Sequence, residues 1–235
     1  MSLKKVLRQK IEAHRPRTTR LMKEFGKVKI DEVTIDQCIG GARDIRALVT
    51  DISYLDPQEG IRFRGKTISE TFEMLPKAEG SNYPTVEAFW FFLLTGEVPS
   101  EEQLEATMLE FKARQHVPHY VFEIIRAMPI DTHPMTMLST GILAMQKDSV
   151  FHEFYSSGQF NKNTAWEYVY EDAFDIVARI PVLAAYIYNL KYRDNKQIEI
   201  NRKLDMGANF AHMIGQSKEY EDVARMYFIL HSDHE

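Results

Sequence analysis

The stretch TAWEYVYEDAFDIVARIPVLAAYIYNLKY, residues 164–192, decides the fold. It opens with Thr164 and has Glu167 three residues later, which is the pattern of a capping box at a helix start. A helical pattern then continues to about Tyr192, so we predict one long helix. Pro181 lies inside this helix, where its ring removes a backbone hydrogen bond, and we expect a kink there.

Helix signals also dominate the chain before this stretch. Ser100-Glu101-Glu102-Gln103 is a further capping box and predicts a helix that runs to about His116. Thr85 can cap an apolar helix over residues 86–94, and Gly96 can end that helix because glycine readily adopts a left-handed conformation.

Two more helices are predicted on either side of the long one. Pro118 suits the first turn of a short helix, because its missing N–H costs nothing there. Ser217 precedes a helix over residues 218–230. One face of that helix carries Tyr220, Val223, Met226, Tyr227 and Leu230. Together these signals predict a mainly α fold.

Residues 47–65 differ from the rest of the chain in composition and in the spacing of their apolar residues. Residues 47–54 are rich in Val, Ile and Tyr, residues 55–60 have the composition of a turn, and residues 61–64 alternate apolar and charged side chains. This order predicts a small β-hairpin.

The helix expected from Pro134 contains small residues in its middle, among them Gly141. A glycine inside a helix costs about 1 kcal/mol relative to alanine, so a packing reason is expected for it. A close interface, within the chain or between subunits, is one interpretation. The other is a helix that tolerates a glycine without any special contact.

Composition limits the class of protein. The 235 residues are 44% hydrophobic and 27% charged, which is ordinary for a soluble globular chain of one large or two small domains. The formal net charge of −5 gives no general electrostatic reason to expect nucleic-acid binding. We expect no membrane span, because no stretch reads as long and apolar enough.

The single cysteine, Cys38, cannot form a disulfide within the chain, which favours a reducing intracellular compartment. We interpret it as a small buried filler rather than a nucleophile. The N-terminal residues 1–20 are basic and have apolar residues at helical spacing. An amphipathic first helix is the preferred interpretation, and the end of a transit peptide is the alternative.

Few residues suggest a site by pattern alone. His231 and His234 could share a helix face and bind a metal, but no third ligand is clear, so no metal site is predicted. Gly40-Gly41-Ala42-Arg43 places a guanidinium after two flexible residues, where it could meet a phosphate. Arg62 and Arg64 are interpreted as partners in salt bridges at the surface of the sheet. Phosphate-binding glycine loops and the nucleophile elbow are absent from the sequence.

Eight segments together resemble the citrate synthase family, in its order and at close to its spacing. They are residues 40–43 (GGAR), 55–65 (LDPQEGIRFRG), 74–78 (MLPKA), 89–99 (FWFFLLTGEVP), 133–135 (HPM), 166–172 (WEYVYED), 204–210 (LDMGANF) and 231–235 (HSDHE). The resemblance covers nearly the whole chain from about residue 3. It is closer to the eukaryotic, mitochondrial type than to the short bacterial type.

The resemblance implies a multi-helical large domain, a homodimer and a place in the mitochondrial matrix. It implies an acyltransferase of the tricarboxylic acid cycle, which condenses acetyl-CoA with oxaloacetate and water to give citrate and CoA. Acetyl-CoA is then a substrate, and no metal or redox cofactor is implied. In the family a carboxylate removes a proton from the acetyl methyl group, and histidines stabilise the enol and protonate the oxaloacetate carbonyl.

The resemblance also implies where this chain departs from a complete enzyme. The catalytic histidines and aspartate of the family lie beyond Glu235, so no catalytic residue is assigned to this chain. Ala208 stands where the animal enzymes carry a substrate-contacting histidine. Plant-type members also have a small residue at this position. The helices from Pro134 and Lys218 match segments of the family's dimer interface.

Two residues carry over as binding residues for CoA. Arg43 matches an arginine that reaches the CoA phosphate from the neighbouring subunit. Lys162 is the nearest candidate for the basic residue near Trp166, although its spacing differs by about one residue from the animal pattern.

We therefore expect residues 1–235 to be the N-terminal portion of the large domain, with the small catalytic domain and the C-terminal part absent. The parent enzyme is expected to make citrate, and the 235 residues alone are expected to be inactive. Two alternatives stay open, namely 2-methylcitrate synthase and a non-catalytic dimerisation module derived from the family.

Overall fold

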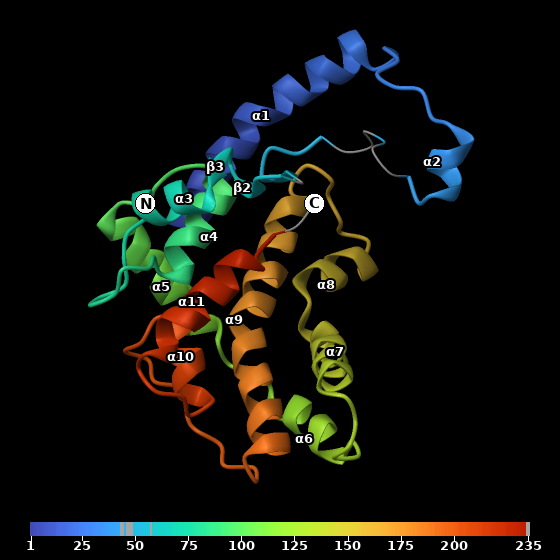
Figure 1. The fold of residues 1–235 in the computed structure, drawn as a ribbon. Helices are drawn as coiled ribbons and strands as arrows, with labels where there is room; N and C mark the ends of the chain where they lie inside the picture. The colour runs from blue at the N-terminus through green and yellow to red at the C-terminus, as the bar shows by residue number, and fades with distance from the viewer. Residues whose placement is uncertain (43–44, 46–48, 57, 234–235) are drawn as a thin grey trace.

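A computed structural model describes residues 1–42, 45, 49–56 and 58–233 (Figure 1). The α-helices are α1 (Leu3–Phe25), α2 (Ile35–Ile39), α3 (Ile68–Met74), α4 (Val86–Thr95), α5 (Glu101–Arg114), α6 (His119–Ala127), α7 (Pro134–Ala144), α8 (Val150–Ser156), α9 (Ala165–Tyr192), α10 (Met206–Met213) and α11 (Tyr220–Leu230). A short 3-10 helix, η1 (Met145–Asp148), follows α7. The predicted mainly α class is confirmed.

The sheet is small and antiparallel. Its strands are β1 (Ser53–Asp56), β2 (Gly60–Phe63) and β3 (Lys66–Thr67), in the order β1-β2-β3. The predicted hairpin is confirmed for β1 and β2. The third strand was not predicted, because two residues show no alternation. The turn between β1 and β2 is held by Asp56 Oδ1, which accepts hydrogen bonds from the backbone N–H groups of Gln58 and Glu59.

Helix α9 forms the spine of the molecule, and both of its ends fall close to the predicted ones (Figure 1). The helix continues through Pro181, which is buried inside it. The predicted capping box was wrong, because Thr164 makes no capping hydrogen bond with its side chain. Its backbone has φ −110° and ψ 4° rather than the extended geometry of an N-cap, and its hydroxyl donates to the carbonyl of Asn161.

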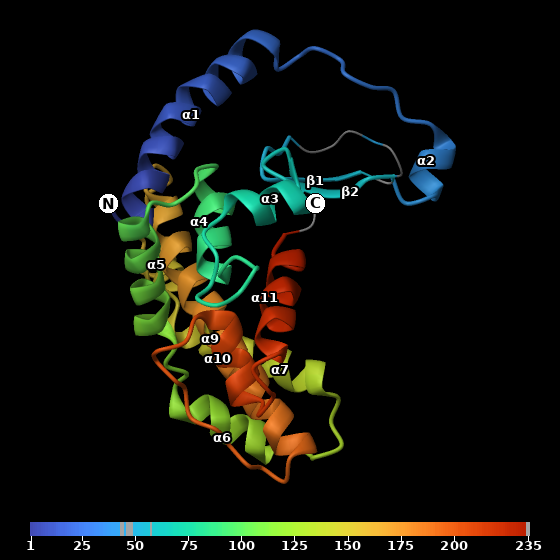
Figure 2. The same ribbon diagram turned by 60° about the vertical axis from the view of Figure 1, so that its left-hand side comes forward.

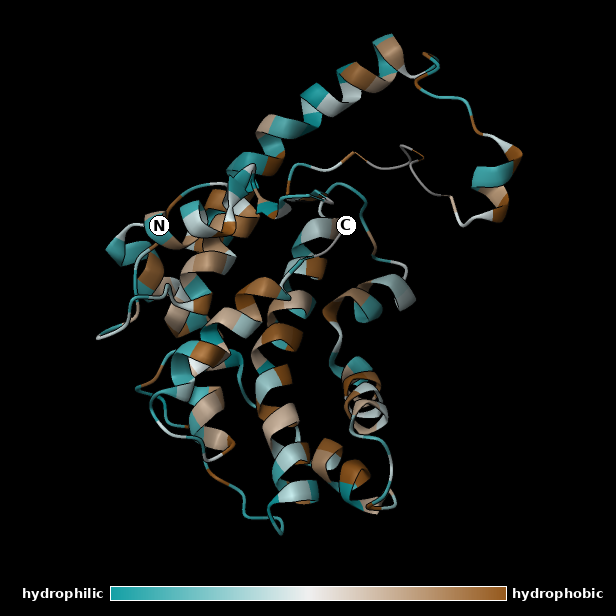
Figure 3. Cartoon of the chain, viewed as in Figure 1, coloured by the Kyte–Doolittle hydropathy of each residue, from teal (hydrophilic) through white to brown (hydrophobic). Residues whose placement is uncertain are grey.

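By length and composition, α9 could also cross a membrane, so the expectation that no stretch could do so was wrong. Four charged residues lie in the first half of α9, and Arg179 and Lys191 lie in its second half, so hydrophilic positions recur along the helix (Figure 3). Phe174, Ala178, Leu183 and Ile187 of this helix are buried in apolar clusters with other helices. A buried core helix of a soluble protein passes the same test, so this finding is weak evidence for a span.

Local helix signals before α9 are confirmed. Ser100 and Gln103 form the predicted capping box of α5. The Thr85 side chain accepts from the N–H of Ala88 at the start of α4, and Gly96 ends α4 with φ 73°. Pro118 sits one position earlier than predicted, at the N-cap of α6.

The core consists of several apolar clusters, among them two that pack directly against α9. Its first half packs with α1, α4 and α5, where Phe111 stacks on Phe174 with ring centroids 4.8 Å apart. Its second half packs with α6 and α7 around Leu183. Beneath the sheet, Phe63 meets Phe89 of α4 edge to face at 4.8 Å.

The close approach of α7 to α9 explains why residue 141 is a glycine. A Cβ atom at this position would lie 2.6 Å from Cδ2 and 3.3 Å from Cδ1 of Leu183, so a larger residue would force the buried Leu183 side chain to shift. Of the two interpretations from sequence, the close interface is confirmed at Gly141, and it lies within the chain.

We expect Gly141→Val to lower the free energy of unfolding by about 2 kcal/mol, because its branched side chain overlaps the fully buried Leu183. Thermal unfolding should show a decrease of about 5 °C in Tm. Ser139→Val is the matched control, since Ser139 is an exposed residue of the same helix. Equal Tm values for the two variants would contradict the packing argument.

The distal part of α1, the connection after it and α2 stand away from the helical body (Figure 2). We call residues 16–39 the N-terminal arm. Except for Gln37, every residue of the arm is exposed. Cys38 is therefore exposed as well, and its prediction as a buried filler was wrong, because α2 buries none of its residues.

Candidate functional site

The start of α10 is built around a buried carboxylate. Asp205 is the N-cap residue, and its Oδ1 accepts hydrogen bonds from the N–H groups of Gly207 (3.1 Å) and Ala208 (3.2 Å). These two N–H groups have no partner inside the helix, so the carboxylate satisfies them. The segment that carries Ala208 is thereby fixed at its first turn.

Arg225 of α11 holds the same carboxylate from the other side. Its Nε lies 3.2 Å from Asp205 Oδ1, and its Nη2 lies 2.6 Å from Oδ2. The guanidinium also pairs with Asp222 at 2.6 Å and with Glu221 at 3.3 Å. The Arg225 side chain is only 4% exposed, so this cation depends on its acidic partners.

Gly207 lets the two helices approach closely enough for this arrangement. A Cβ atom there would lie 2.6 Å from Arg225 Cγ and 3.1 Å from its backbone Cα. The close contact between α10 and α11 therefore lies at Gly207.

Glu87 of α4 completes the group, which we call the buried charge cluster: Glu87, Asp205, Glu221, Asp222 and Arg225. Glu87 is 1% exposed, and its Oε1 accepts the N–H of Met206 at 2.9 Å. Its Oε2 is buried without a hydrogen-bond partner among the described groups. Burial, together with the negative charge of Asp205, raises the pKa of Glu87 to about 7.

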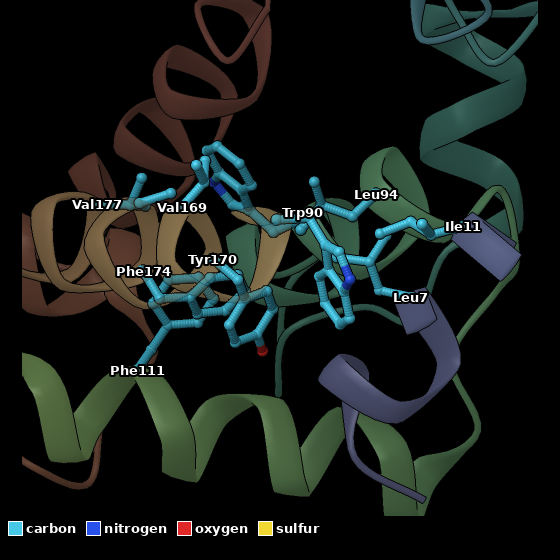
Figure 4. A pocket seen from close by; sticks show the side chains of 11 residues that line it. Leu7, Ile11, Trp90, Leu94, Phe111, Val169, Tyr170, Phe174 and Val177 are labelled. Carbon is cyan, nitrogen blue, oxygen red and sulfur yellow. The ribbon is translucent and has the colours of Figure 1, made fainter. Parts of the chain in front are cut away.

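A second feature is an apolar cavity of about 380 Å³ between α1, α4, α5 and α9 (Figure 4). Leu7 and Ile11 of α1 line it on one side and Trp90 of α4 lies beside them, while Phe174 and Val177 of α9 lie opposite. Tyr170 also lines the cavity, but its hydroxyl hydrogen-bonds the carboxylate of Glu110 at 3.0 Å. The residues that line the cavity are apolar apart from the Tyr170 hydroxyl and the Trp indole N–H groups, and no acid–base pair is among them.

Of the two predicted CoA-binding residues, the structure describes only Lys162. Arg43 lies outside the described residues. Lys162 is exposed in the turn before α9, where it makes no hydrogen bond or ion pair with the described part of the chain. Both assignments therefore stay predictions.

Of the two histidines at the C-terminal end, the structure describes only His231. His231 is exposed and stacks on Tyr227 with ring centroids 4.2 Å apart, and its Nδ1 lies 2.8 Å from the Tyr227 carbonyl oxygen. His234 lies outside the described residues. Within residues 1–42, 45, 49–56 and 58–233, no three His, Cys, Asp or Glu side chains group to hold a metal ion.

The two arginines near the sheet have structural partners, as predicted. Arg62 pairs with Glu59, and Arg64 lies 3.2 Å from Asp51. Arg64 also donates to the carbonyl oxygens of Leu93 (2.7 Å) and Leu94 (3.0 Å) at the end of α4. These hydrogen bonds tie the sheet to the C-terminus of that helix.

Solved structures define the fold class. Citrate synthase from Pyrobaculum aerophilum matches with a TM-score of 0.71 and 24% identity, over 88% of this chain and 52% of that one. Citrate synthase from Thermoplasma acidophilum, in a ternary complex with carboxymethyl coenzyme A and oxaloacetate, matches with a TM-score of 0.64 and 20% identity, over 87% of this chain and 49% of that one. The fold of this chain is that of about half of each of these enzymes.

Sequence comparisons then give the family. The family model for the citrate synthase C-terminal domain matches residues 41–235. Citrate synthase 4, mitochondrial, of Arabidopsis thaliana is 41% identical over 236 aligned positions, which include all of this chain and 50% of the relative. The chain belongs to the citrate synthase family. It spans about half the length of the curated relatives it matches.

Proposed function

We propose that the chain supplies the helical half of an enzyme that condenses acetyl-CoA with oxaloacetate to form citrate and CoA. The observation that carries this proposal is the 41% identity to a mitochondrial citrate synthase along the whole chain. The missing acid–base groups belong to the half that this chain does not span, so the 235 residues alone are inactive. Their role is to form the scaffold of α4, α9, α10 and α11 and to present binding residues.

The experiment that tests this function uses a chimera, in which residues 1–235 replace the matching half of the Arabidopsis thaliana relative. Thiol release from acetyl-CoA that depends on oxaloacetate is the readout. The chimera is expected to be active, whereas the 235-residue chain alone is expected to be silent. A folded but silent chimera would contradict the proposed activity, and turnover by the chain alone would contradict the division of roles.

Arg43 and Lys162 are proposed to bind the phosphates of CoA, because guanidinium and ammonium groups are suited to phosphate oxygens. In the chimera we expect Arg43→Ala to raise the KM for acetyl-CoA about tenfold, with the KM for oxaloacetate unchanged. Arg20→Ala is the control, since Arg20 is exposed and, among the described residues, forms its ion pair with Glu24 alone. An unchanged KM for acetyl-CoA in Arg43→Ala would remove this assignment.

A homodimer is proposed from exposed apolar side chains on α11. Of the stripe predicted from sequence, Tyr220, Val223, Tyr227 and Leu230 are 37%, 43%, 60% and 39% exposed. The opposite face of α11 is the buried one, with Ala224, Arg225 and Ile229. The N-terminal arm adds further exposed apolar residues, among them Met22, Ile35 and Ile39. A second copy of the chain would cover these surfaces.

We expect Val223→Glu to convert the dimeric chimera into a monomer, because the new charge would be buried at the interface. Sedimentation velocity measures this change directly. Val98→Glu is the matched control, since Val98 is 42% exposed and lies in the loop after α4. A dimer that survives Val223→Glu would place the interface elsewhere.

A location in the mitochondrial matrix is proposed from the names of the relatives, several of which are mitochondrial citrate synthases. Import of the parent protein fused to a fluorescent reporter tests this location.

A further inference from the structure

The described residues leave the apolar cavity between α1, α4, α5 and α9 open to solvent. Val169 of α9 is 51% exposed, and Ala173, one turn further along the same helix, is exposed as well. Both tryptophans of the chain, Trp90 and Trp166, line the cavity and are only half-buried. Tryptophan has a large apolar surface to bury, so two of them left partly in water indicate a surface that another element covers.

The side chains around the cavity form rows that suit a further helix. Three helices each contribute a pair of lining residues four positions apart (Figure 4). The pairs are Leu7 and Ile11 of α1, Trp90 and Leu94 of α4, and Val169 and Ala173 of α9. Residues four apart lie one above the other on a helix face, so each pair is part of a ridge. Ridges of this kind pack into the grooves on the surface of another helix.

The charges at the edge of the cavity disfavour an acidic amphiphile such as a fatty acid. Arg8 of α1 lies 5.8 Å from the ring centre of Trp166 and 3.2 Å from the carboxylate of Glu167. Lys4 pairs with Glu171 at 2.5 Å. Because both cations already have a carboxylate partner, the acidic head of a ligand would have to displace an existing ion pair. The apolar face of a protein helix needs no such exchange.

The length of the relatives indicates where this helix comes from. The chain spans about half the length of the curated relatives it matches, so an enzyme of that length has a comparable number of further residues to pack against it. A second copy of the chain is a poorer occupant. A two-fold axis brings identical surfaces together, and a concave surface cannot fill a copy of itself.

We propose that the apolar cavity is the docking groove for an amphipathic helix from the half of the parent enzyme outside residues 1–235. This inference rests on the proposed function, because it takes the parent to have the length of the relatives. The docked helix carries apolar residues at positions i, i+4 and i+7 on the face that enters the groove. The two halves are then joined by this packing as well as by the chain between them.

The experiment compares the accessibility of position 169 in the 235-residue chain and in the chimera with the other half of the Arabidopsis thaliana relative. Val169→Cys is treated with a water-soluble thiol reagent, and peptide mass spectrometry follows the modification at that position alone. We expect the thiol to react at least about tenfold more slowly in the chimera, because burial shields it from the reagent. Leu109→Cys is the matched control and should react equally fast in both proteins. Leu109 is 60% exposed on α5 and does not line the cavity.

Equal rates at position 169 in the chain and in the folded chimera would overturn the proposal. Equal protection at positions 109 and 169 would also overturn it, because the burial would then not be specific to the groove. If Val169→Cys does not fold, Ala173→Cys reports on the same face of α9. The test is repeated in the Val223→Glu chimera, which is expected to be monomeric. Loss of protection there would overturn the proposal by assigning the groove to a second copy.

The labelling result does not depend on citrate formation. An active chimera in which position 169 stays accessible would overturn this inference and leave the proposed activity standing. A chimera that protects position 169 but forms no citrate would overturn the activity and leave the docking groove standing.

Discussion

Replacing Arg225 by methionine lowers the free energy of unfolding by about 4 kcal/mol, the largest effect we expect from a single substitution. The reason is the buried charge cluster. The 4% exposed guanidinium is the only cation that pairs with Asp205 among the described residues, and it also pairs with Glu221 and Asp222. Methionine fills a similar volume but leaves the Asp205 carboxylate buried without a counter-ion.

Chemical denaturation of the purified chain measures this loss. Arg20→Met is the matched control, since Arg20 is exposed and its pair with Glu24 contributes little, about 0.5 kcal/mol or less. Adding Asp205→Asn to Arg225→Met should recover part of the stability, because the second substitution removes the unpaired charge. If Arg225→Met and Arg20→Met unfold at the same denaturant concentration, the cluster does not hold α10 and α11 together.

Replacing Glu87 by glutamine changes how stability depends on pH. The folded chain holds the Glu87 proton up to a pKa of about 7, whereas the unfolded chain releases it near 4.5. Between these values the folded state binds more protons, so its stability falls as pH rises, and the loss is complete above about pH 7. At 1.36 kcal/mol for each pKa unit, the loss is about 3 kcal/mol.

Glutamine keeps an oxygen for the Met206 N–H and carries no charge, so Glu87→Gln should escape this loss. Relative to the parent chain, the variant should therefore gain about 3 kcal/mol between pH 4.5 and pH 8, as measured by denaturation at each pH. The difference between the two chains cancels other titrating groups, such as Glu171, whose pKa is lowered by Lys4 and Arg114 against the effect of burial.

Glu105→Gln, at an exposed position on α5, is the control and should follow the parent at every pH. A Glu87→Gln curve that stays parallel to the parent curve would show that Glu87 is ionised in the folded state throughout this range.

Features encoded by short-range signals could be predicted from the sequence. Ser100 and Gln103 satisfy each other's neighbouring backbone groups, so their four residues are enough to place the start of α5. The long helix was predicted within about one residue at each end, although its predicted cap at Thr164 does not form. The apolar pattern of the segment was enough for that prediction. Packing stabilises the helix, so the cap was not needed.

Features that depend on tertiary contacts could not be predicted in the same way. The sequence shows the stripe of Tyr220, Val223, Met226, Tyr227 and Leu230, but a pattern does not show which partner covers it. Within this chain all of these except Met226 are exposed. The prediction that Cys38 is buried was also wrong, because no local signal in the sequence indicates that α2 lies outside the helical body.

The buried charge cluster was missed, although one signal was present. Glu87 interrupts the most apolar run of the sequence, and a charged residue in such a run indicates a buried partner. Its contact with the N–H of Met206 joins residues 119 positions apart, so the partner itself needs the structure.

The most direct test of the central claim is the product that the chimera forms from labelled acetyl-CoA and oxaloacetate, identified by mass spectrometry. We predict citrate that carries the label of the acetyl group, formed only when residues 1–235 are joined to the other half. A folded, dimeric chimera that forms no labelled citrate, beside an intact relative that does, would contradict the claim that this chain is the helical half of a citrate-forming enzyme.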